Sequence, residues 1–332
     1  MIGETDRPTI DVIIPTYKPG EKTAKLLRRL AKQTYPIGKV IVINTEALYW
    51  DESLRGCYPG LEVHHIKKED FDHGGTRHMA VSFSHADLFL CMTDDAVPAG
   101  PHLVERLVEG FGARGPKGER PAMVYGRQLA DRDCELSERY ARRFNYPKEG
   151  CVKTAADIPR LGIKTYFGSN VCCAYDRQIY EDQGGFIRHT IFNEDMIFAG
   201  NAVQAGYAVV YEARARVIHS HNYGNRQQFS RNFDLGVSQA DHPEVFGGLP
   251  SEGEGLRLAG RTAADLLKSG HPFHLPGLVV RCGCKYAGYR LGKVYRHLPD
   301  WLVRWCTSSP GYWEMKAGRA VQWAQEETGE TI

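Results

Sequence analysis

The stretch that decides the fold is residues 9–20, which read TIDVIIPTYKPG. Residues 10–15 are a nearly unbroken apolar run, as is typical of a short strand that is covered on both faces. A Lys-Pro-Gly turn follows, and the leucines of residues 22–33 then recur with the period of a helix. The alternation continues with strand-like runs at 40–43, 61–66 and 87–92 and helical patterns at 76–84 and 101–111. It predicts an α/β fold with a doubly wound, mainly parallel sheet and helices on both faces.

The alternation is looser in the rest of the chain, where the composition also changes. Strand-like runs lie at 122–125, 171–175 and 208–211, and helical patterns at 195–205 and 227–239. The 332 residues include 42 Lys or Arg and 40 Asp or Glu, yet residues 256–319 contain eleven basic and three acidic side chains. We therefore expect an α/β domain over residues 1–245 and a basic, aromatic-rich helical region over residues 246–332.

Several classes of protein are disfavoured by the sequence. No apolar run is long enough to span a bilayer, and the first residues do not form a secretory signal. The nine cysteines include no C-x-x-C pair, which favours reduced thiols in a cytoplasmic protein. Neither G-x-G-x-x-G nor G-x-x-x-x-G-K-[ST] occurs, so a dinucleotide dehydrogenase and a P-loop NTPase lose support.

Two adjacent acids follow one of the predicted strands. In sheets of this kind ligands bind beyond the carboxyl ends of the strands, and Asp94 and Asp95 come directly after the run at 87–92. Adjacent carboxylates repel each other unless a cation or strong hydrogen-bond donors compensate their charge. Carboxylate oxygens are hard ligands, which suit Mg²⁺ or Mn²⁺. The alternative is a solvated turn that holds no ligand.

A pair of glycines lies in FDHGGTRH, residues 71–78. Consecutive glycines let backbone N–H groups approach an anion closely, and the helix start beyond them adds favourable dipole charge. Arg77 then pairs with a phosphate or with a carboxylate. The alternative is an ordinary loop before a helix.

Two further segments carry ionisable side chains. Glu194 and Asp195 stand at the start of a predicted helix, as capping acids or as a base that accepts a proton from a hydroxyl. His219 and His221 are two residues apart on a predicted strand, so both project to one face and can approach one metal ion or phosphate. The alternative for each histidine is a core or surface side chain without a ligand.

Taken in order, these segments resemble the motifs of family-2 glycosyltransferases of the GT-A fold, and within them the bacterial rhamnosyltransferase-like group. The resemblance covers roughly residues 9–240 and rests on TIDVIIPTYKPG, FDHGGTRHMA, MTDDAVP, GSNVCCAYDRQIYEDQGGF, FNEDMIFAGNAVQAGY and VIHSHNYGNRQQFSRNFDLG. It implies metal-dependent, inverting transfer of a sugar, with L-rhamnose from dTDP-L-rhamnose favoured. The implied acceptor is a hydroxyl of a glycan or a polyprenyl-linked molecule in cell-surface polysaccharide synthesis.

The resemblance also implies roles for individual residues. Asp195 stands at the position of the catalytic base, with Glu194 beside it, and Asp95, His219 and His221 stand at the site of a divalent metal, Mn²⁺ or Mg²⁺. The residues implied in donor binding are Pro15, Thr16, Tyr17, Asn44, Glu46, Gly74, Gly75, Arg77 and Asp94. After the second strand the chain reads INTE, where many members have an acidic loop, so the choice between thymine and uracil stays open.

The C-terminal region contains one strong helical pattern. Apolar residues recur at spacings of four and three, at Val280, Cys284, Ala287, Leu291, Val294 and Leu298, with basic side chains and tyrosines around them. A basic amphipathic helix with aromatic residues is typical of a protein that lies on an anionic bilayer, so residues 278–305 are expected to contact the inner face of the plasma membrane. The alternative is that the apolar stripe packs on the catalytic domain. No nucleic-acid motif accompanies the charge, and nucleic acid is not expected as a partner.

Two other functions remain open. One keeps the fold but uses a UDP-hexose as the donor. The other is a subunit that binds a sugar nucleotide without catalysis, and the presence of Asp94, Asp95, Asp195 and both histidines counts against it.

Overall fold

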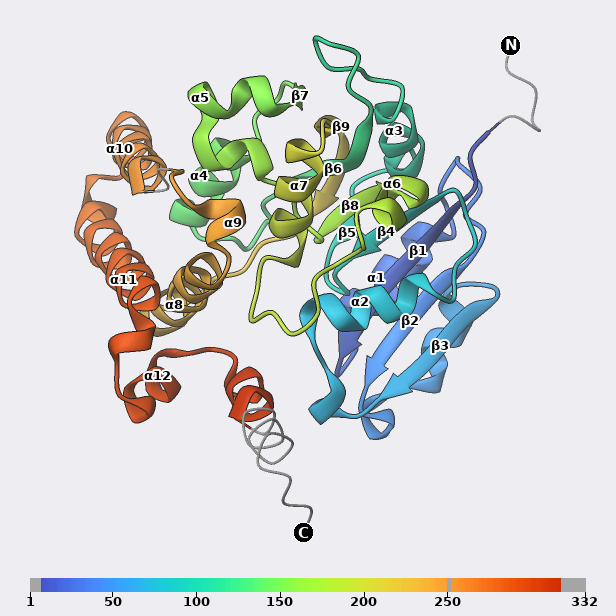
Figure 1. The fold of residues 1–332 in the computed structure, drawn as a ribbon, viewed down its shortest axis with the longest axis horizontal. Coiled ribbons are helices and arrows are strands. Elements are labelled where there is room, and N and C mark those ends of the chain that lie inside the picture. The colour runs from blue at the N-terminus through green and yellow to red at the C-terminus, as the bar shows by residue number, and fades with distance from the viewer. Residues whose placement is uncertain (1–6, 250–251, 318–332) are drawn as a thin grey trace.

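The computed structural model describes residues 7–249 and 252–317. Its centre is a sheet whose strands, within these residues, follow the order β3-β2-β1-β4-β8-β6-β9-β5, with β7 beside β9 (Figure 1). The strands are β1 (Ile10–Tyr17), β2 (Val40–Thr45), β3 (Leu61–Ile66), β4 (Leu88–Met92), β5 (Val97–Pro98), β6 (Pro121–Leu129), β7 (Cys151–Lys153), β8 (Cys172–Asp176) and β9 (Ala208–Ile218).

The predicted α/β fold class is confirmed, and the sheet has a parallel half and a mixed half. β1 runs parallel to both β2 and β4, and β2 runs parallel to β3. Beyond β4, the strand β8 is antiparallel to both of its neighbours, and β6 is parallel to β9. The sequence pattern did not indicate this change of direction, because short elements rather than one crossover helix connect β6 to β8.

Helices cover both faces of the sheet because side chains of a strand alternate between its faces. Ile10, Val12 and Ile14 pack with residues of α1 and α3, whereas Ile13 packs with residues of α2, α6 and α7. The first helices are α1 (Glu21–Leu30), α2 (His73–Val81), α3 (Leu103–Gly110), α4 (Leu136–Asn145), α5 (Ile158–Leu161), α6 (Arg177–Asp182) and α7 (Glu194–Gln204).

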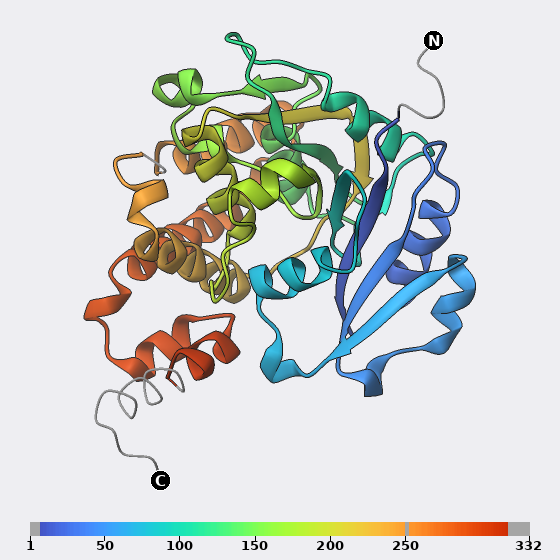
Figure 2. The same cartoon turned by 45° about the vertical axis from the view of Figure 1, so that its right-hand side comes forward.

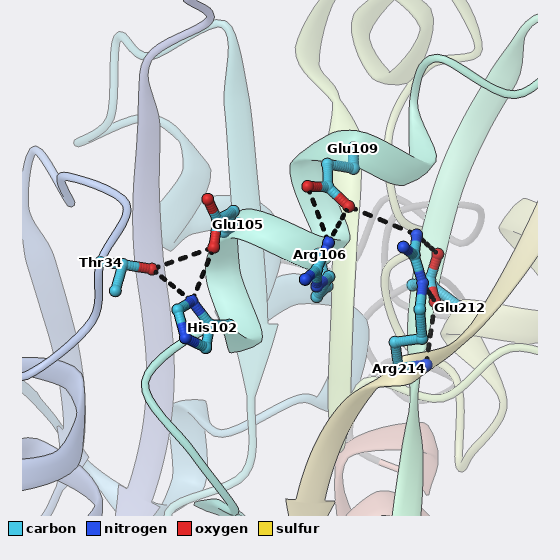
Figure 3. Close-up of polar contacts among 7 residues, drawn as sticks. All are labelled: Thr34, His102, Glu105, Arg106, Glu109, Glu212 and Arg214. Carbon is cyan, nitrogen blue, oxygen red and sulfur yellow. Dashed lines mark hydrogen bonds and ion pairs between the residues drawn. The ribbon is translucent and has the colours of Figure 1, made fainter.

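Polar contacts hold α3 against β9, the strand that precedes the two histidines (Figure 3). Arg106 and Glu109 of α3 pair at 2.7 Å, and Arg214 of β9 lies 3.3 Å from Glu109 and 2.8 Å from Glu212. Most of these side chains reach solvent, so each pair contributes less than about 1 kcal/mol. Together they orient the helix on the strand rather than stabilise the fold strongly.

The C-terminal helices lie away from β3 (Figures 1 and 2). They are α9 (Pro243–Phe246), α10 (Glu252–Lys268), α11 (Leu275–Lys293) and α12 (Asp300–Cys306), followed by a helical stretch at 310–317. Most of them pack on α8 (Asn225–Asp241), whereas α10 packs on α11 and α4. A hydrophobic cluster joins both parts of the chain and contains Ile191, Phe233, Val237, Tyr295, Val303, Cys306 and Trp313. The region after residue 245 therefore shares a core with α8, as far as the described residues extend.

The face of α11 that packs on α8 is not the predicted apolar stripe. Gly288 and Gly292 make the contact so closely that a Cβ atom would lie 2.2 Å from the carbonyl oxygen of Phe229 and 2.1 Å from that of Phe233, respectively. Val280, by contrast, is 52% exposed. The alternative that the stripe packs on the catalytic domain holds only in part, because Leu291 and Leu298 pack against the shared cluster whereas Val280 and Val294 are exposed.

Candidate active site

Three side chains meet where β4 and β9 end. Nε2 of His219 lies 3.4 Å from one carboxylate oxygen of Asp95, and Nε2 of His221 lies 3.3 Å from the other. The two Nε2 atoms are 3.0 Å apart, and the potential ligand atoms of the cluster lie within 4.8 Å of one another. The structure thus brings together the three residues that the sequence offered as metal ligands.

The chemistry of this cluster fits a divalent cation. Nδ1 of His219 lies 3.0 Å from Oε1 of Gln128, and an amide oxygen accepts a proton. This contact holds the imidazole of His219 with its Nε2 atom toward Asp95, the orientation that a metal-binding imidazole needs. Burial and the charge of His219 lower the pKa of His221 to about 4, so its imidazole is neutral at neutral pH. One carboxylate and two imidazoles are a suitable donor set for Mn²⁺.

The expected donor-binding residues of β1 and β4 lie side by side at the strand ends. Oγ1 of Thr16 donates to Oδ2 of Asp94 at 2.5 Å, which ties β1 to the turn after β4. Burial raises the pKa of Asp94. Pro15 is half-buried in β1, and Tyr17 is 43% exposed, with its ring 5.6 Å from the ring of Tyr49 in an edge contact. Tyr49 lies in no recognisable motif, so it was not selected as a candidate.

The two residues offered after β2 support the turn there. The Nδ2 group of Asn44 donates to the carbonyl oxygen of Glu46 and lies 3.0 Å from Nδ1 of His65. Oε1 of Glu46 accepts from the backbone N–H of Lys68 at 2.6 Å. Oδ1 of Asn44 is buried without a hydrogen-bond partner. The amide oxygen of Asn44 is therefore an unused hydrogen-bond acceptor, whereas the carboxylate of Glu46 anchors the loop at Lys68.

Asp195 lies at the start of α7 with a half-buried carboxylate. Its oxygens accept from the backbone N–H groups of Asn170 at 2.9 Å and Met196 at 2.8 Å. Burial, with the negative charge of Glu194, raises the pKa of Asp195 well above its ordinary value. A carboxylate with a raised pKa is a stronger proton acceptor, as a general base requires.

The side chain of Glu194, the residue before Asp195, is buried and makes its contacts within the protein. Oε1 of Glu194 lies 3.1 Å from Nη1 of Arg77 and accepts from Nδ2 of Asn170 at 2.9 Å. Burial alone would raise the pKa of Glu194, but the Arg77 charge outweighs it and the pKa is lowered. Glu194 is therefore ionised and already paired, so it places negative charge beside Asp195 instead of receiving a substrate proton.

Gly74, Gly75 and Arg77 make their contacts within the protein, and Arg77 pairs with a carboxylate, one of its two expected partners. Both glycines lie in the first turn of α2, where the N–H of Gly75 donates to the Asp72 side chain and a Cβ atom on Gly74 would lie 1.8 Å from the carbonyl oxygen of Ile187. Arg77 is buried and faces Glu194. Gly74 is thus a packing contact with the loop before α7, while the N–H of Gly75 is taken up by Asp72, so the pair does not present an open anion-binding loop.

Sequence reasoning missed two side chains that connect these groups. Asn170 donates to Asp195 from its backbone N–H and to Glu194 from its side-chain amide, and Gln128 contacts His219 and donates to Oγ of Ser169 at 3.1 Å. Asn170 belongs to the quoted segment GSNVCCAYD but has no chemistry of its own that would single it out. Gln128 lies in no motif.

Comparison with solved structures identifies the fold. The structure resembles that of the mannosyltransferase PcManGT from Pyrobaculum calidifontis in complex with GDP-Man and Mn²⁺, with a TM-score of 0.53 and 14% sequence identity. The match covers 96% of this chain and 81% of that one. This likeness shows a fold of the GT-A class.

Comparison of sequences is more specific. The model of glycosyl transferase family 2 matches residues 11–184, and the chain belongs to this family. It is 39% identical to the O-antigen chain rhamnosyltransferase RfbN of Salmonella typhimurium over 92% of this chain and 96% of the relative. It is 36% identical to the O-antigen chain rhamnosyltransferase WbaN of Salmonella anatum, with the same coverage. The expected family and enzyme class, a glycosyltransferase similar to bacterial rhamnosyltransferases, are confirmed.

Proposed function

We propose that this protein transfers L-rhamnose from dTDP-L-rhamnose to a hydroxyl of a glycan or polyprenyl-linked acceptor, in the assembly of a cell-surface polysaccharide. The similarity to two O-antigen chain rhamnosyltransferases along nearly the whole chain carries this proposal. The grouping of Asp95 with His219 and His221, and the raised pKa of Asp195, support it from the structure.

The residues divide the reaction between two sides of the site. On the acceptor side, Asp195 accepts the hydroxyl proton during attack, and backbone donors at Asn170 and Met196 keep its carboxylate oriented. Attack from the face opposite the departing nucleoside diphosphate inverts the anomeric carbon. On the donor side, the strand ends that carry Thr16 and Asp94 place the nucleotide.

Asp95, His219 and His221 are the residues that would hold the divalent ion. When bound there, the ion supplies positive charge that offsets the charge developing on the departing diphosphate. Gln128 fixes the orientation of His219 toward that position through the hydrogen bond to Nδ1.

A panel of donors tests this proposal. The full chain is incubated with Mn²⁺ and each of dTDP-L-rhamnose, a UDP-hexose and GDP-mannose, and thermal unfolding and release of the nucleoside diphosphate are measured. A ligand that binds only the folded state raises the unfolding temperature. We expect the largest shift and the only turnover with dTDP-L-rhamnose. Turnover with a UDP-hexose would show that the donor is a UDP-hexose and not dTDP-L-rhamnose. No response to any sugar nucleotide would favour a non-catalytic subunit.

An anionic membrane surface is part of the proposal, through residues 278–305 and the helices around them. No helix among the residues that the structure describes is long and apolar enough to cross a bilayer. The C-terminal helices and their connections nevertheless expose large apolar side chains at Leu256, Leu267, Phe273, Val279, Val280, Tyr286, Val294, Trp301 and Trp305. Their basic surroundings match anionic lipid headgroups in charge.

Vesicle flotation tests this contact. We expect the full chain to float with vesicles that contain an anionic lipid, and the double substitution Phe273→Ser/Val279→Ser to weaken flotation. Leu48→Ser is the matched control, because Leu48 is 84% exposed but lies in the other half of the molecule. Equal flotation of all three proteins, or none by the wild type, would refute the contact.

A further inference from the structure

A second concave site lies next to the catalytic residues, where β6 meets α4. Its volume is about 440 Å³. Five arginines from the end of β6, the loop after it and α4 line it, together with a single acid; these residues are Arg127, Arg132, Arg139, Arg142, Arg143 and Asp131. We call it the arginine pocket. No function assigned above uses it.

Only one of these guanidinium groups is neutralised by the protein, within the part of the chain that the structure describes. Nε of Arg142 pairs with Glu138 at 2.7 Å, and Arg142 also donates to Oε1 of Gln128. Arg139 donates to the carbonyl oxygens of Arg132 and Cys134, which orient it without cancelling its charge.

The remaining guanidinium groups have no carboxylate within ion-pair distance among the described residues. Nε of Arg127 is moreover buried and has no hydrogen-bond partner. Like charges gathered in one hollow repel each other, and a buried donor left unpaired costs about 1–3 kcal/mol. An anion that occupies the pocket removes both costs.

The position of the pocket connects it to the acceptor half of the site. Tyr146 and Gln128 line it, Gln128 donates to Ser169, and the next residue, Asn170, holds the carboxylate of Asp195. In the sheet, β8 separates β6 from β4, and the nucleotide-binding strand ends lie beyond β4. The pocket is thus linked to the base through Gln128, Ser169 and Asn170, and it also adjoins the metal cluster, because Gln128 contacts His219.

We infer that the arginine pocket binds a phosphate or diphosphate group carried by the acceptor. Several guanidinium groups in one concave site match the oxygens of such groups, because each presents paired N–H donors in a plane. The inference rests on the proposed function only in assigning the anion to the acceptor. The binding of the anion itself requires no turnover.

Calorimetric titration with inorganic pyrophosphate tests the pocket directly. The full chain is titrated in EDTA, so that a metal bound by Asp95 does not contribute. The test variant is Arg132→Ala/Arg143→Ala, because both side chains are exposed and lie outside the catalytic contacts. The control is Arg28→Ala/Arg55→Ala, which removes two exposed arginines from the other half of the chain.

The expected result is pyrophosphate binding by the wild type and the control, and binding at least about tenfold weaker in the test variant, since charged hydrogen bonds contribute about 1.5–3 kcal/mol each. Addition of dTDP should not displace pyrophosphate. No binding, equal binding by both variants, or displacement by dTDP would overturn the inference.

A kinetic arm distinguishes an anion on the acceptor from free phosphate. The same glycan is offered with a diphosphate-linked alkyl chain and with a free reducing end. The test variant should raise KM at least tenfold for the first and leave KM for the second unchanged. Equal effects on both would overturn the assignment to the acceptor. Absence of rhamnosyl transfer by the wild type would refute the proposed function while the titration still decides the anion site.

Discussion

Replacing Arg77 with methionine removes the positive half of a buried ion pair that stands directly behind the base. Nη1 of Arg77 lies 3.1 Å from Oε1 of Glu194, and the two side chains are 7% and 6% exposed. Methionine occupies a similar elongated volume but leaves the Glu194 carboxylate without its cation. The substitution therefore tests whether the ion pair holds α2 against the start of α7.

The expected cost follows from the burial of both groups. Leaving one charge of a buried pair uncompensated costs about 3–5 kcal/mol. With a urea dependence of about 3 kcal/mol per molar, this lowers the unfolding midpoint by about 1–1.7 M. In Arg77→Met/Glu194→Gln no charge is left buried, so this protein should be more stable than the sum of the single changes predicts by about 1–3 kcal/mol.

Urea unfolding followed by circular dichroism at pH 7 measures both values. Arg120→Met is the matched control, because Arg120 pairs with Asp176 at 3.2 Å but is 59% exposed. Such a surface pair contributes less than about 1 kcal/mol. The reasoning is refuted if Arg77→Met costs no more than Arg120→Met, or if the effects of the two buried substitutions simply add.

Three further predictions follow from the site and the helix packing. Asp195→Asn should lower turnover by about 10²–10⁴-fold and leave donor binding intact, since the base acts only on the acceptor proton; near-normal turnover would exclude Asp195 as the base. Folding raises the pKa of Asp195, so the folded state is favoured while this carboxyl is protonated, and the stability of the wild type relative to Asp195→Asn should fall as the pH rises from 5 to 8. Wild-type turnover should instead fall as the solution is acidified, because protonation removes the base. A pH-independent difference in urea midpoints would contradict the burial argument. Gly292→Ala should cost about 1–3 kcal/mol, because its Cβ would lie 2.1 Å from the carbonyl oxygen of Phe233, whereas Gly283→Ala meets no atom within 4 Å and should not destabilise; equal urea midpoints would refute the close helix contact.

Much of the fold could be predicted because its signals are local. Residues 10–15 indicated β1 (Ile10–Tyr17), and residues 227–239 indicated α8 (Asn225–Asp241), since each segment carries its own hydrophobic period. The helix α4 (Leu136–Asn145) was missed because LSERYARRFN is dominated by polar and charged side chains. Its burial depends on neighbours that lie far away in the sequence.

The candidate site could be predicted only in part, because some of its contacts also depend on residues far away in the sequence. Strand ends indicated Asp95 and the two histidines, because the carboxyl ends of strands are where ligands bind. Arg77 was expected beside the donor, yet it faces Glu194. A guanidinium group matches a phosphate and a carboxylate equally well, so the residue type alone does not select the partner.

The sequence by itself determined the order of the main strands and helices of the parallel half, the acids that follow β4 and begin α7, and the family. Tertiary structure decided which charges are neutralised by the protein and which face of α11 packs inward. Arg77 is neutralised by Glu194, while Arg127 of β6 and Arg143 of α4 have no carboxylate partner among the described residues. The physical reason is that periodicity depends on neighbours along the chain, whereas burial and ion pairing depend on segments that meet only when the chain folds.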